Sequence, residues 1–259
     1  MRRKLQTGIA TMAHVVAALV LMTGQLAWGK TLDVKSILAK CDGAEGFENN
    51  FAEMRQIITT TGGEKRTLVL RAWAVNNGEK QLAEYLTPAD IKGQKILMTD
   101  FGDNIWMFNP VTRRTRKLGS HMRKKKVMGS DFTYEDQAGG RISQKYTGDV
   151  RGTEQMSGVP AWVVELEPTP EGPSYDKIVA WIGKADYMIR RVDYYQDGDS
   201  QPFKRLIAED IRTVGGKRVP FKMTMTNLED RTETVNEIVS IRFDAKVPAS
   251  IFESRNLEK

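Results

Sequence analysis

Cysteine and histidine are scarce in this chain of 259 residues, which has one cysteine and two histidines. Cys41 stands alone, so the chain cannot form an internal disulfide. A zinc site needs several His, Cys or acidic ligands at short spacings, and no such spacing occurs in the sequence. No glycine-rich loop of the phosphate-binding kind is present either. We therefore expect no metal and no cofactor.

A catalytic centre is equally hard to find. His121 lies within a run of basic residues, and no G-x-S-x-G context for a nucleophile accompanies it. The segment Asp197-Gly198-Asp199 has a weak resemblance to a calcium loop but lacks the distal glutamate, and a hairpin turn explains it better. Acidic residues are plentiful, so residue type alone does not exclude a glycosidase with paired carboxylates. Because most acids alternate with apolar residues, as solvent-facing strand residues do, we expect a protein that is not an enzyme.

The N-terminus has the pattern of a secretory signal peptide. Arg2, Arg3 and Lys4 precede an uncharged, mostly apolar stretch from Ile9 to Leu26, and Ala27-Trp28-Gly29 offers small residues for cleavage after Gly29. A retained membrane anchor is the alternative, but polar residues interrupt the stretch, and a spanning helix needs about 20 predominantly apolar residues. We predict a signal peptide at 1–29 and a single domain at 30–259.

Removing that signal leaves a mildly basic chain. The whole sequence has 39 basic and 33 acidic residues. The signal contains three basic residues and no acid, so 39 minus three leaves 36 basic residues and a net charge of +3. The positive charge is concentrated between positions 113 and 126, in Arg113, Arg114, Arg116, Lys117, Arg123, Lys124, Lys125 and Lys126.

One helix and many short strands are expected. The helix spans Leu32 to Cys41, with Thr31 as its cap and Gly43 and Gly46 ending it. The strands are expected at 51–59, 66–75, 79–86, 95–99, 104–109, 114–118, 143–150, 161–167, 174–182, 188–196, 202–213, 218–228 and 233–243. Tight turn signals such as Asn76-Asn77-Gly78 and Gly215-Gly216 separate many of them, which indicates an antiparallel meander.

Alternation along the strands predicts a sheet with one apolar and one polar face. Trp162, Val164 and Leu166 share one face, and Val235, Val239, Ile241 and Phe243 are expected to lie together. Few helices are available to cover the apolar face, so a strongly curved sheet around its own helices is expected. The nine methionines after the signal suit an irregular apolar surface. The predicted wall of an acyl-chain cavity is Met54, Trp73, Tyr85, Trp106, Phe108, Phe132, Trp162, Val164, Trp181, Phe221, Met223 and Met225.

The basic run from Arg113 to Lys126 allows several interpretations. Clustered lysines and arginines can bind phosphates of nucleic acid, but export from the cytoplasm argues against that partner. The run can also be a solvated hairpin that protects a sheet edge. A lipid headgroup or an acidic protein face is the interpretation we favour, because concentrated positive charge attracts anions.

Several motifs resemble the LolA-like family of outer-membrane lipoprotein-sorting proteins, over most of the chain from Phe51 to Phe252. They are Pro88-Ala89-Asp90-Ile91-Lys92-Gly93, Ile105-Trp106-Met107-Phe108-Asn109-Pro110, the Arg113–Lys117 strand, Met128-Gly129-Ser130-Asp131-Phe132-Thr133-Tyr134-Glu135-Asp136, Gly158-Val159-Pro160-Ala161-Trp162, and Tyr175-Asp176-Lys177-Ile178-Val179-Ala180-Trp181-Ile182. The resemblance is strongest for a subgroup often paired with membrane transporters of the resistance-nodulation-division type.

This resemblance implies an α+β fold, mainly antiparallel β: an unclosed curved β-half-barrel with helices lidding its concave face. It implies a periplasmic carrier that binds the acyl chains of lipids or lipoproteins. Such a carrier contacts membranes transiently and passes its cargo between membranes or to an inner-membrane transporter of the resistance-nodulation-division type. An arginine on an early strand matters in the family, and Arg55 and Arg71 are its candidates here. The insert Lys124–Arg141 is the expected moving lid. The alternative is a periplasmic interaction protein of the same fold that senses lipid or stress without net transport.

Overall fold

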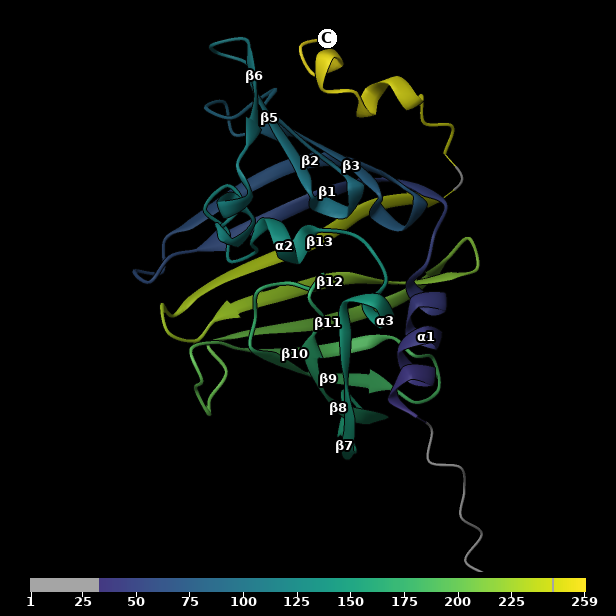
Figure 1. Cartoon of the computed structure of the whole chain (residues 1–259). Helices are drawn as coiled ribbons and strands as arrows, with labels where there is room; N and C mark the ends of the chain where they lie inside the picture. The colour runs from purple at the N-terminus through teal and green to yellow at the C-terminus, as the bar shows by residue number, and fades with distance from the viewer. Residues whose placement is uncertain (1–32, 244) are drawn as a thin grey trace, which may run out of the picture. The chain divides into compact units, whose positions relative to one another are not determined.

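One antiparallel sheet of thirteen strands dominates the structure, a computed structural model that describes residues 33–243 and 245–259. The strand order is β6-β5-β4-β3-β2-β1-β13-β12-β11-β10-β9-β8-β7, so β6 and β7 are unpaired edges and the sheet does not close. Figure 1 shows the curved sheet with α2 and α3 over one face and α1 beside them. The predicted unclosed half-barrel is confirmed.

The sheet consists of two meanders joined through its central strands. The first contains β1 (Asn49–Thr59), β2 (Lys65–Val75), β3 (Lys80–Thr87), β4 (Lys95–Thr99), β5 (Asn104–Asn109) and β6 (Arg114–Leu118). The second contains β7 (Tyr146–Met156), β8 (Val159–Pro168), β9 (Lys177–Gly183), β10 (Ile189–Tyr195), β11 (Lys204–Val214), β12 (Lys217–Asn227) and β13 (Thr232–Phe243). The last strand, β13, returns to pair with β1, from Asn50 opposite Phe243 to Thr59 opposite Glu233.

Helices are short apart from the first. They are α1 (Val34–Glu45), α2 (Tyr134–Gln137) and α3 (Ile142–Lys145), with 3-10 turns η1 (Asn76–Gly78), η2 (Asp100–Gly102), η3 (Ser120–Lys124), η4 (Ala249–Phe252) and η5 (Ser254–Asn256). None of the helices in the described residues combines the length and apolarity that a membrane crossing requires. The predicted signal peptide at 1–29 lies outside the described residues.

The first helix differs from its prediction at both ends. Its cap is Asp33, whose carboxylate accepts a hydrogen bond from the backbone N–H of Lys35 at 3.3 Å. Gly43 was expected to end the helix but lies inside it, where an added Cβ would meet open space. The helix ends at Gly46, whose backbone is extended and where a Cβ would lie 2.8 Å from the carbonyl oxygen of Asp42. The helix therefore ends where the backbone becomes extended, at a position where a side chain would meet the carbonyl of Asp42.

The predicted strand 143–150 is wrong at its start. Ile142–Lys145 is the helix α3, and β7 begins only at Tyr146. The reason is a tertiary cap: the carboxylate of Asp42 on α1 accepts hydrogen bonds from the backbone N–H of Ile142 at 2.7 Å and of Ser143 at 3.3 Å. These N–H groups have no partner inside a short helix, so the carboxylate stabilises its first turn.

A bulge in β13 changes the expected apolar stripe. Glu53 pairs with Ser240 and Met54 with Ile238, which leaves Val239 as the extra residue. The bulge turns Val239 outward, where it is 64% exposed. Val235 pairs with Ile57, whereas the next pair, Gln56 and Asn236, faces inward. Because neighbouring pairs alternate, Val235 faces outward. The prediction that Val235 and Val239 share a face with Ile241 is therefore wrong.

The outer face is less polar than expected. The C-terminal turns pack on it, so that Phe252 and Leu257 form a buried cluster with Leu82, Leu97 and Phe108. A second outer cluster contains Ala161, Val163 and Trp181. The sheet thus carries apolar clusters on both faces, because a chain segment after β13 covers part of its outer surface.

Candidate functional site

The concave face of the sheet encloses a cavity of about 370 Å³, which we call the central cavity. Its wall is formed by β1–β4, β10–β13 and the insert between β6 and β7. Most of the wall is aliphatic, methionine or aromatic: Ala52, Met54, Leu70, Ala72, Tyr85, Ile96, Met98, Phe132, Tyr194, Leu206, Met223, Met225 and Ile238. A cavity lined this way suits an apolar ligand.

A few polar groups interrupt this apolar wall. The side-chain amide of Gln56 donates to Oδ1 of Asn236 at 2.9 Å, and the Oε1 atom of Gln56 is buried without a hydrogen-bond partner among the described residues. An unpaired buried acceptor is costly. The side chain of Gln56 therefore keeps one unused hydrogen-bond acceptor at a mostly apolar wall, and neither amide was singled out from the sequence.

The insert closes one side of the cavity through buried carboxylates. Asp131 is 2% exposed and accepts hydrogen bonds from Thr232 Oγ1 at 2.6 Å and Thr234 Oγ1 at 2.9 Å on β13. Its backbone N–H donates back to Thr234 Oγ1 at 2.9 Å. Lys126 pairs with Asp131 at 3.1 Å and with Asp230 at 3.0 Å. Burial opposes the charged amine, but these carboxylates raise the pKa of Lys126.

A second buried group ties the insert to β11. Lys204 Nζ lies 2.7 Å from Asp136 Oδ2, with side chains only 3% and 2% exposed. The hydroxyl of Tyr175 donates to Asp136 Oδ1 at 2.6 Å and accepts from Lys204 Nζ at 2.7 Å. Lys204 also lies 4.7 Å from the ring centre of Tyr194. Burial, and next the negative charge of Asp136, raise the pKa of Tyr175, so its proton stays in place.

A third contact and an internal cap complete the attachment. The carboxylate of Glu135 accepts hydrogen bonds from Ser174 Oγ at 2.8 Å and from its backbone N–H at 3.2 Å. Thr133 and Asp136 form a capping box around α2. The predicted lid therefore covers the concave face as expected, and three carboxylates of the Ser130–Asp136 motif hold it there.

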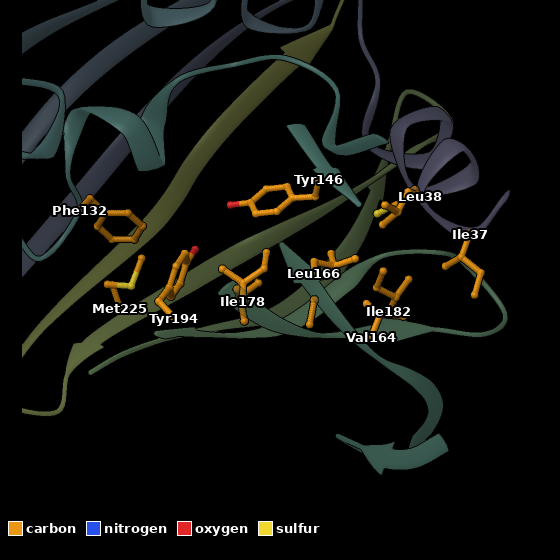
Figure 2. Close-up of a cluster of buried hydrophobic side chains, with 13 residues drawn as sticks. Ile37, Leu38, Phe132, Tyr146, Val164, Leu166, Ile178, Ile182, Tyr194 and Met225 are labelled. Carbon is orange, nitrogen blue, oxygen red and sulfur yellow. The ribbon is translucent and has the colours of Figure 1, made fainter. Parts of the chain in front are cut away.

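A neighbouring cavity of about 340 Å³ lies on the side of α1, and we call it the α1-side cavity. It shares wall residues with the central cavity: Phe47, Asn50, Tyr194, Leu206, Met223 and Ile241. Next to it, the helix α1 covers a core of buried side chains from β7 to β12. Figure 2 shows Ile37 and Leu38 of α1 with Val164, Leu166 and Ile182, and Phe132 of the insert beside Met225 and Tyr194.

Six of the twelve predicted cavity residues line the central cavity. They are Met54, Trp73, Tyr85, Phe132, Met223 and Met225. Trp73 only borders this cavity, because its ring packs against the outer cluster of Leu82 and Phe108, 5.3 Å from the ring of Phe51 and beneath the guanidinium of Arg71. Val164 and Trp162 lie instead in or against the core under α1, where Trp162 contacts Tyr187 at 5.3 Å.

The other four predicted residues lie elsewhere. Trp106 and Phe108 belong to the outer cluster under the C-terminal turns. Trp181 pairs across the strands with Val163 on the outer face, where its indole N–H donates to Glu154 at 2.8 Å. Phe221 is buried beneath Arg212 at 4.2 Å and lines neither cavity. Strand alternation, which places neighbours on opposite faces, explains the outward positions of Trp106, Phe108 and Trp181.

The two arginines suggested by the family resemblance also lie outside the cavities. Arg55 pairs with Glu237 at 2.5 Å and is 52% exposed. Arg71 pairs with Glu84 at 2.9 Å and is 43% exposed. Neither of them lines the central or the α1-side cavity. A different arginine, Arg190, lines the α1-side cavity, and no sequence pattern pointed to it.

The eight residues of the basic run do not form one uniform patch. Arg123 pairs with Asp103 at 2.6 Å, and Lys126 holds Asp131 and Asp230. Lys117 lies over the ring of Trp106 at 5.3 Å on the outer face. Arg116 lies opposite Met107 in the β5–β6 register, on the inner face. The remaining five form no ion pair within the described chain and are exposed: Arg113, Arg114, Arg116, Lys124 and Lys125.

Two observations concern metal ligands and the single cysteine. The described residues contain no cluster of three or more His, Cys, Asp or Glu side chains that could hold a metal ion. Cys41 is fully buried, and burial raises the pKa of its thiol, so the nucleophilic thiolate is disfavoured. The arrangement can bind an apolar ligand and present positive charge at a sheet edge.

Three solved structures share this architecture over nearly their whole length. A putative outer membrane lipoprotein-sorting protein domain from Vibrio parahaemolyticus has a TM-score of 0.80 at 24% identity, covering 87% of this chain and 98% of that one. A DUF1329 family protein from Desulfovibrio piger has a TM-score of 0.79 at 21% identity, covering 86% and 97%. A LolA superfamily protein from Nitrosomonas europaea has a TM-score of 0.71 at 18% identity, covering 86% and 98%.

At the level of sequence, no curated protein matches the chain. A family model described as "Uncharacterized protein" matches residues 77–259, which is more than half of the chain. The chain therefore belongs to the family that this model describes, and its fold is that of the LolA-like proteins.

Proposed function

We propose that this protein is a periplasmic carrier that holds acyl chains of lipids or lipoproteins in its central cavity and passes them between membranes or to a membrane transporter. The observation that carries the proposal is the apolar cavity of about 370 Å³ between the concave sheet and the insert. The LolA-like fold supports it, because one solved structure with this fold is described as a lipoprotein-sorting domain.

Burial of an acyl chain supplies enough free energy for useful affinity. Each methylene removed from water contributes about 0.8 kcal/mol, so a dozen contribute roughly 10 kcal/mol before the cost of ordering the chain. Met54, Met98, Met223 and Met225 give the wall flexible side chains that can repack around different tails.

Delivery requires a contact with a membrane or a membrane protein. Arg113 and Arg114 at the β5–β6 turn and Lys124 and Lys125 at the end of η3 are exposed and form no ion pair within the described residues. Such cations attract anionic lipids and acidic protein surfaces. An inner-membrane transporter of the resistance-nodulation-division type is the partner we propose, and the periplasm is the compartment.

A cavity-filling variant tests this function. Ala72→Phe on β2 fills the central cavity, whereas Val69→Phe adds the same ring to the other face of the same strand. Lipid is extracted from each purified protein and identified by mass spectrometry, and transfer of a fluorescent phospholipid between vesicles is measured. We expect wild type and Val69→Phe to hold and transfer lipid, and Ala72→Phe to lose most of both. Wild-type protein without bound lipid and without uptake of a fluorescent fatty acid would refute the proposal.

A second candidate is a sensor that binds lipid without transporting it. The buried attachment of the insert through Asp131, Glu135 and Asp136 favours this candidate, because a tightly held lid slows exchange. A sensor would bind lipid as the carrier does but would show no net transfer between vesicles. Recovery of a regulatory protein in a pulldown, combined with no transfer, would decide for the sensor.

A further inference from the structure

Arg190 occupies an unusual place at the wall of the α1-side cavity. It lies at a β-bulge in β10: Ile189 pairs with Ile182, but Arg191 pairs with Trp181, so Arg190 is the extra residue. Its side chain is only 9% exposed. Bulges commonly re-aim a side chain next to a functional site. This bulge brings a guanidinium to a cavity whose wall is otherwise mostly apolar.

The guanidinium of Arg190 is only partly satisfied. Its Nη2 lies 2.7 Å from Asp186 Oδ2, but its Nη1 is buried and has no hydrogen-bond partner among the described residues. A buried donor without a partner is expensive, and more so when it is charged. An acceptor that is not part of the described chain would satisfy it.

Asp186 cannot neutralise this end of the cavity alone. Its Oδ2 is shared between Arg190 and Arg218, each at 2.7 Å. Burial opposes its charge, but these partners lower the pKa of Asp186, so it stays ionised near neutral pH. Two guanidinium groups and one carboxylate leave one positive charge in excess. Lys217 and Glu45 also line the cavity, and burial raises the pKa of Glu45 to about 7, so Glu45 offsets the charge of Lys217 only in part near neutral pH and the positive excess remains.

Apolar walls surround this charge. Ile178, Met188, Val192 and Ile241 line the same cavity. Tyr194, Leu206 and Met223 belong to both cavities, so a chain leaving Arg190 can follow an apolar wall toward the central cavity. Cavities of about 340 Å³ and 370 Å³ lie at the low end of the 300–1,000 Å³ that is usual for small-molecule sites, which favours one acyl chain over several.

We propose that the α1-side cavity binds the small anionic head of a single-chain amphiphile, a carboxylate or phosphate that accepts a hydrogen bond from Nη1 of Arg190, while the acyl chain runs toward the central cavity. This inference rests on the proposed acyl-chain binding and names the head that the site selects. A charge-assisted hydrogen bond to a planar guanidinium discriminates such a head from an alcohol of the same chain length.

The test measures binding to the delipidated mature protein by isothermal titration calorimetry. The probes are palmitate, hexadecyl phosphate, hexadecanol and acetate. We expect palmitate or hexadecyl phosphate to bind about 10-fold or more tightly than hexadecanol, and acetate alone not to bind measurably. Whichever of the two anions binds more tightly identifies the head chemistry.

Two variants locate the effect. Arg190→Gln keeps a polar side chain but removes the charge, and we expect it to abolish the preference for the anion while hexadecanol affinity stays unchanged. Arg191→Gln is the matched control, because Arg191 is the next residue of β10 and points to the outer face, over the ring of Trp181 at 4.1 Å. We expect it to keep the wild-type preference.

The outcomes separate this inference from the function on which it rests. Equal affinity of wild type for palmitate and hexadecanol, or an unchanged preference in Arg190→Gln, would overturn the role of Arg190 and leave acyl-chain binding intact. Binding of no probe with a tail would overturn both. The comparison of probes in wild type needs no variant, so it decides the proposal even when Arg190→Gln does not fold.

Discussion

Lys204 of β11 and Asp136 of the insert form a buried ion pair, with Nζ and Oδ2 2.7 Å apart and both side chains at most 3% exposed. The pair joins two segments that are 68 residues apart in the sequence. It lies beside the wall of the central cavity, to which Asp136 itself contributes. The same residue, Asp136, therefore both holds the insert on the sheet and contributes to the wall of the cavity.

Breaking this pair should destabilise the protein strongly. Asp136→Asn leaves the Lys204 ammonium buried without its counter-charge, which typically costs about 3–5 kcal/mol. The free energy of unfolding, measured in urea, should fall by that amount. Asp210→Asn is the control, since it removes an exposed pair with Arg212 and should leave the free energy of unfolding almost unchanged. A loss for Asp136→Asn no larger than the control's would show that the pair contributes little.

Removing a single hydroxyl group should weaken the attachment of the insert to β13. Thr234→Val removes the hydroxyl that donates to the Asp131 carboxylate and accepts from its backbone N–H. We expect a loss of about 1–3 kcal/mol, because the carboxylate and the N–H stay buried. Amide hydrogen exchange should rise in Val127–Phe132 more than in β9. Thr226→Val on β12 is a control on the neighbouring strand, and equal exchange in both variants would argue against this anchor.

Membrane contact should depend on the exposed cations that form no ion pair. Replacing Arg113, Arg114 and Arg116 with Gln should weaken binding to vesicles that contain phosphatidylglycerol by about 1 kcal/mol per residue. Replacing Lys35, Lys65 and Lys92 removes the same charge elsewhere on the surface and should have a smaller effect. Flotation of the protein with vesicles at low and high salt measures both. Equal losses in the two triple variants would mean that only net charge matters.

Stability should also fall in acid through Asp193. Burial opposes the charged form, but hydrogen bonds from Arg191 and Arg205 lower the pKa of Asp193 below its ordinary value. A group whose pKa is lower in the folded state contributes stability above its unfolded pKa of about 3.9 and loses it as the pH falls through the folded value. The melting temperatures of wild type and Asp193→Asn should therefore differ most near neutral pH and converge below about pH 4. A constant difference down to pH 2 would contradict this.

Cys41 should be inert in the folded protein. It is fully buried on α1, and burial raises the pKa of its thiol. A thiol reagent should label it at a negligible rate in native buffer and fully in urea. Rapid labelling of the native protein would mean that α1 detaches readily from the sheet.

Much of the architecture was readable from local patterns. Alternating apolar residues, Asn-Gly and Gly-Gly turns and the shortness of the runs predicted thirteen extended segments, and each overlaps one strand of the sheet. The hydrophobic effect produces this alternation in each strand, whichever other strands it pairs with. Met54, Tyr85 and Phe132, which were expected in the wall of an acyl-chain cavity, line the central cavity, and their contact with an acyl chain stays a prediction.

The placement of large aromatic residues required the three-dimensional structure. Trp106, Phe108 and Trp181 were expected in the cavity wall, yet they lie on the outer face. The C-terminal turns cover the first two, and Glu154 satisfies the indole of the third. The covering segment is more than a hundred residues away in the sequence, so the local pattern of the strand does not show that the strand's outer face is covered.

The sequence by itself determined the class of this protein: an antiparallel, mostly β chain with a basic edge strand and a motif from Ser130 to Asp136 that resembles one family. Those features follow from local periodicity and composition. Only the tertiary structure decided that Asp131 and Asp136 are buried and hold a lid, that a bulge turns Val239 outward, and that Arg190 meets an apolar cavity with one nitrogen unsatisfied. Each of these depends on groups far apart in the chain, whose burial and pairing are set when the sheet brings them together.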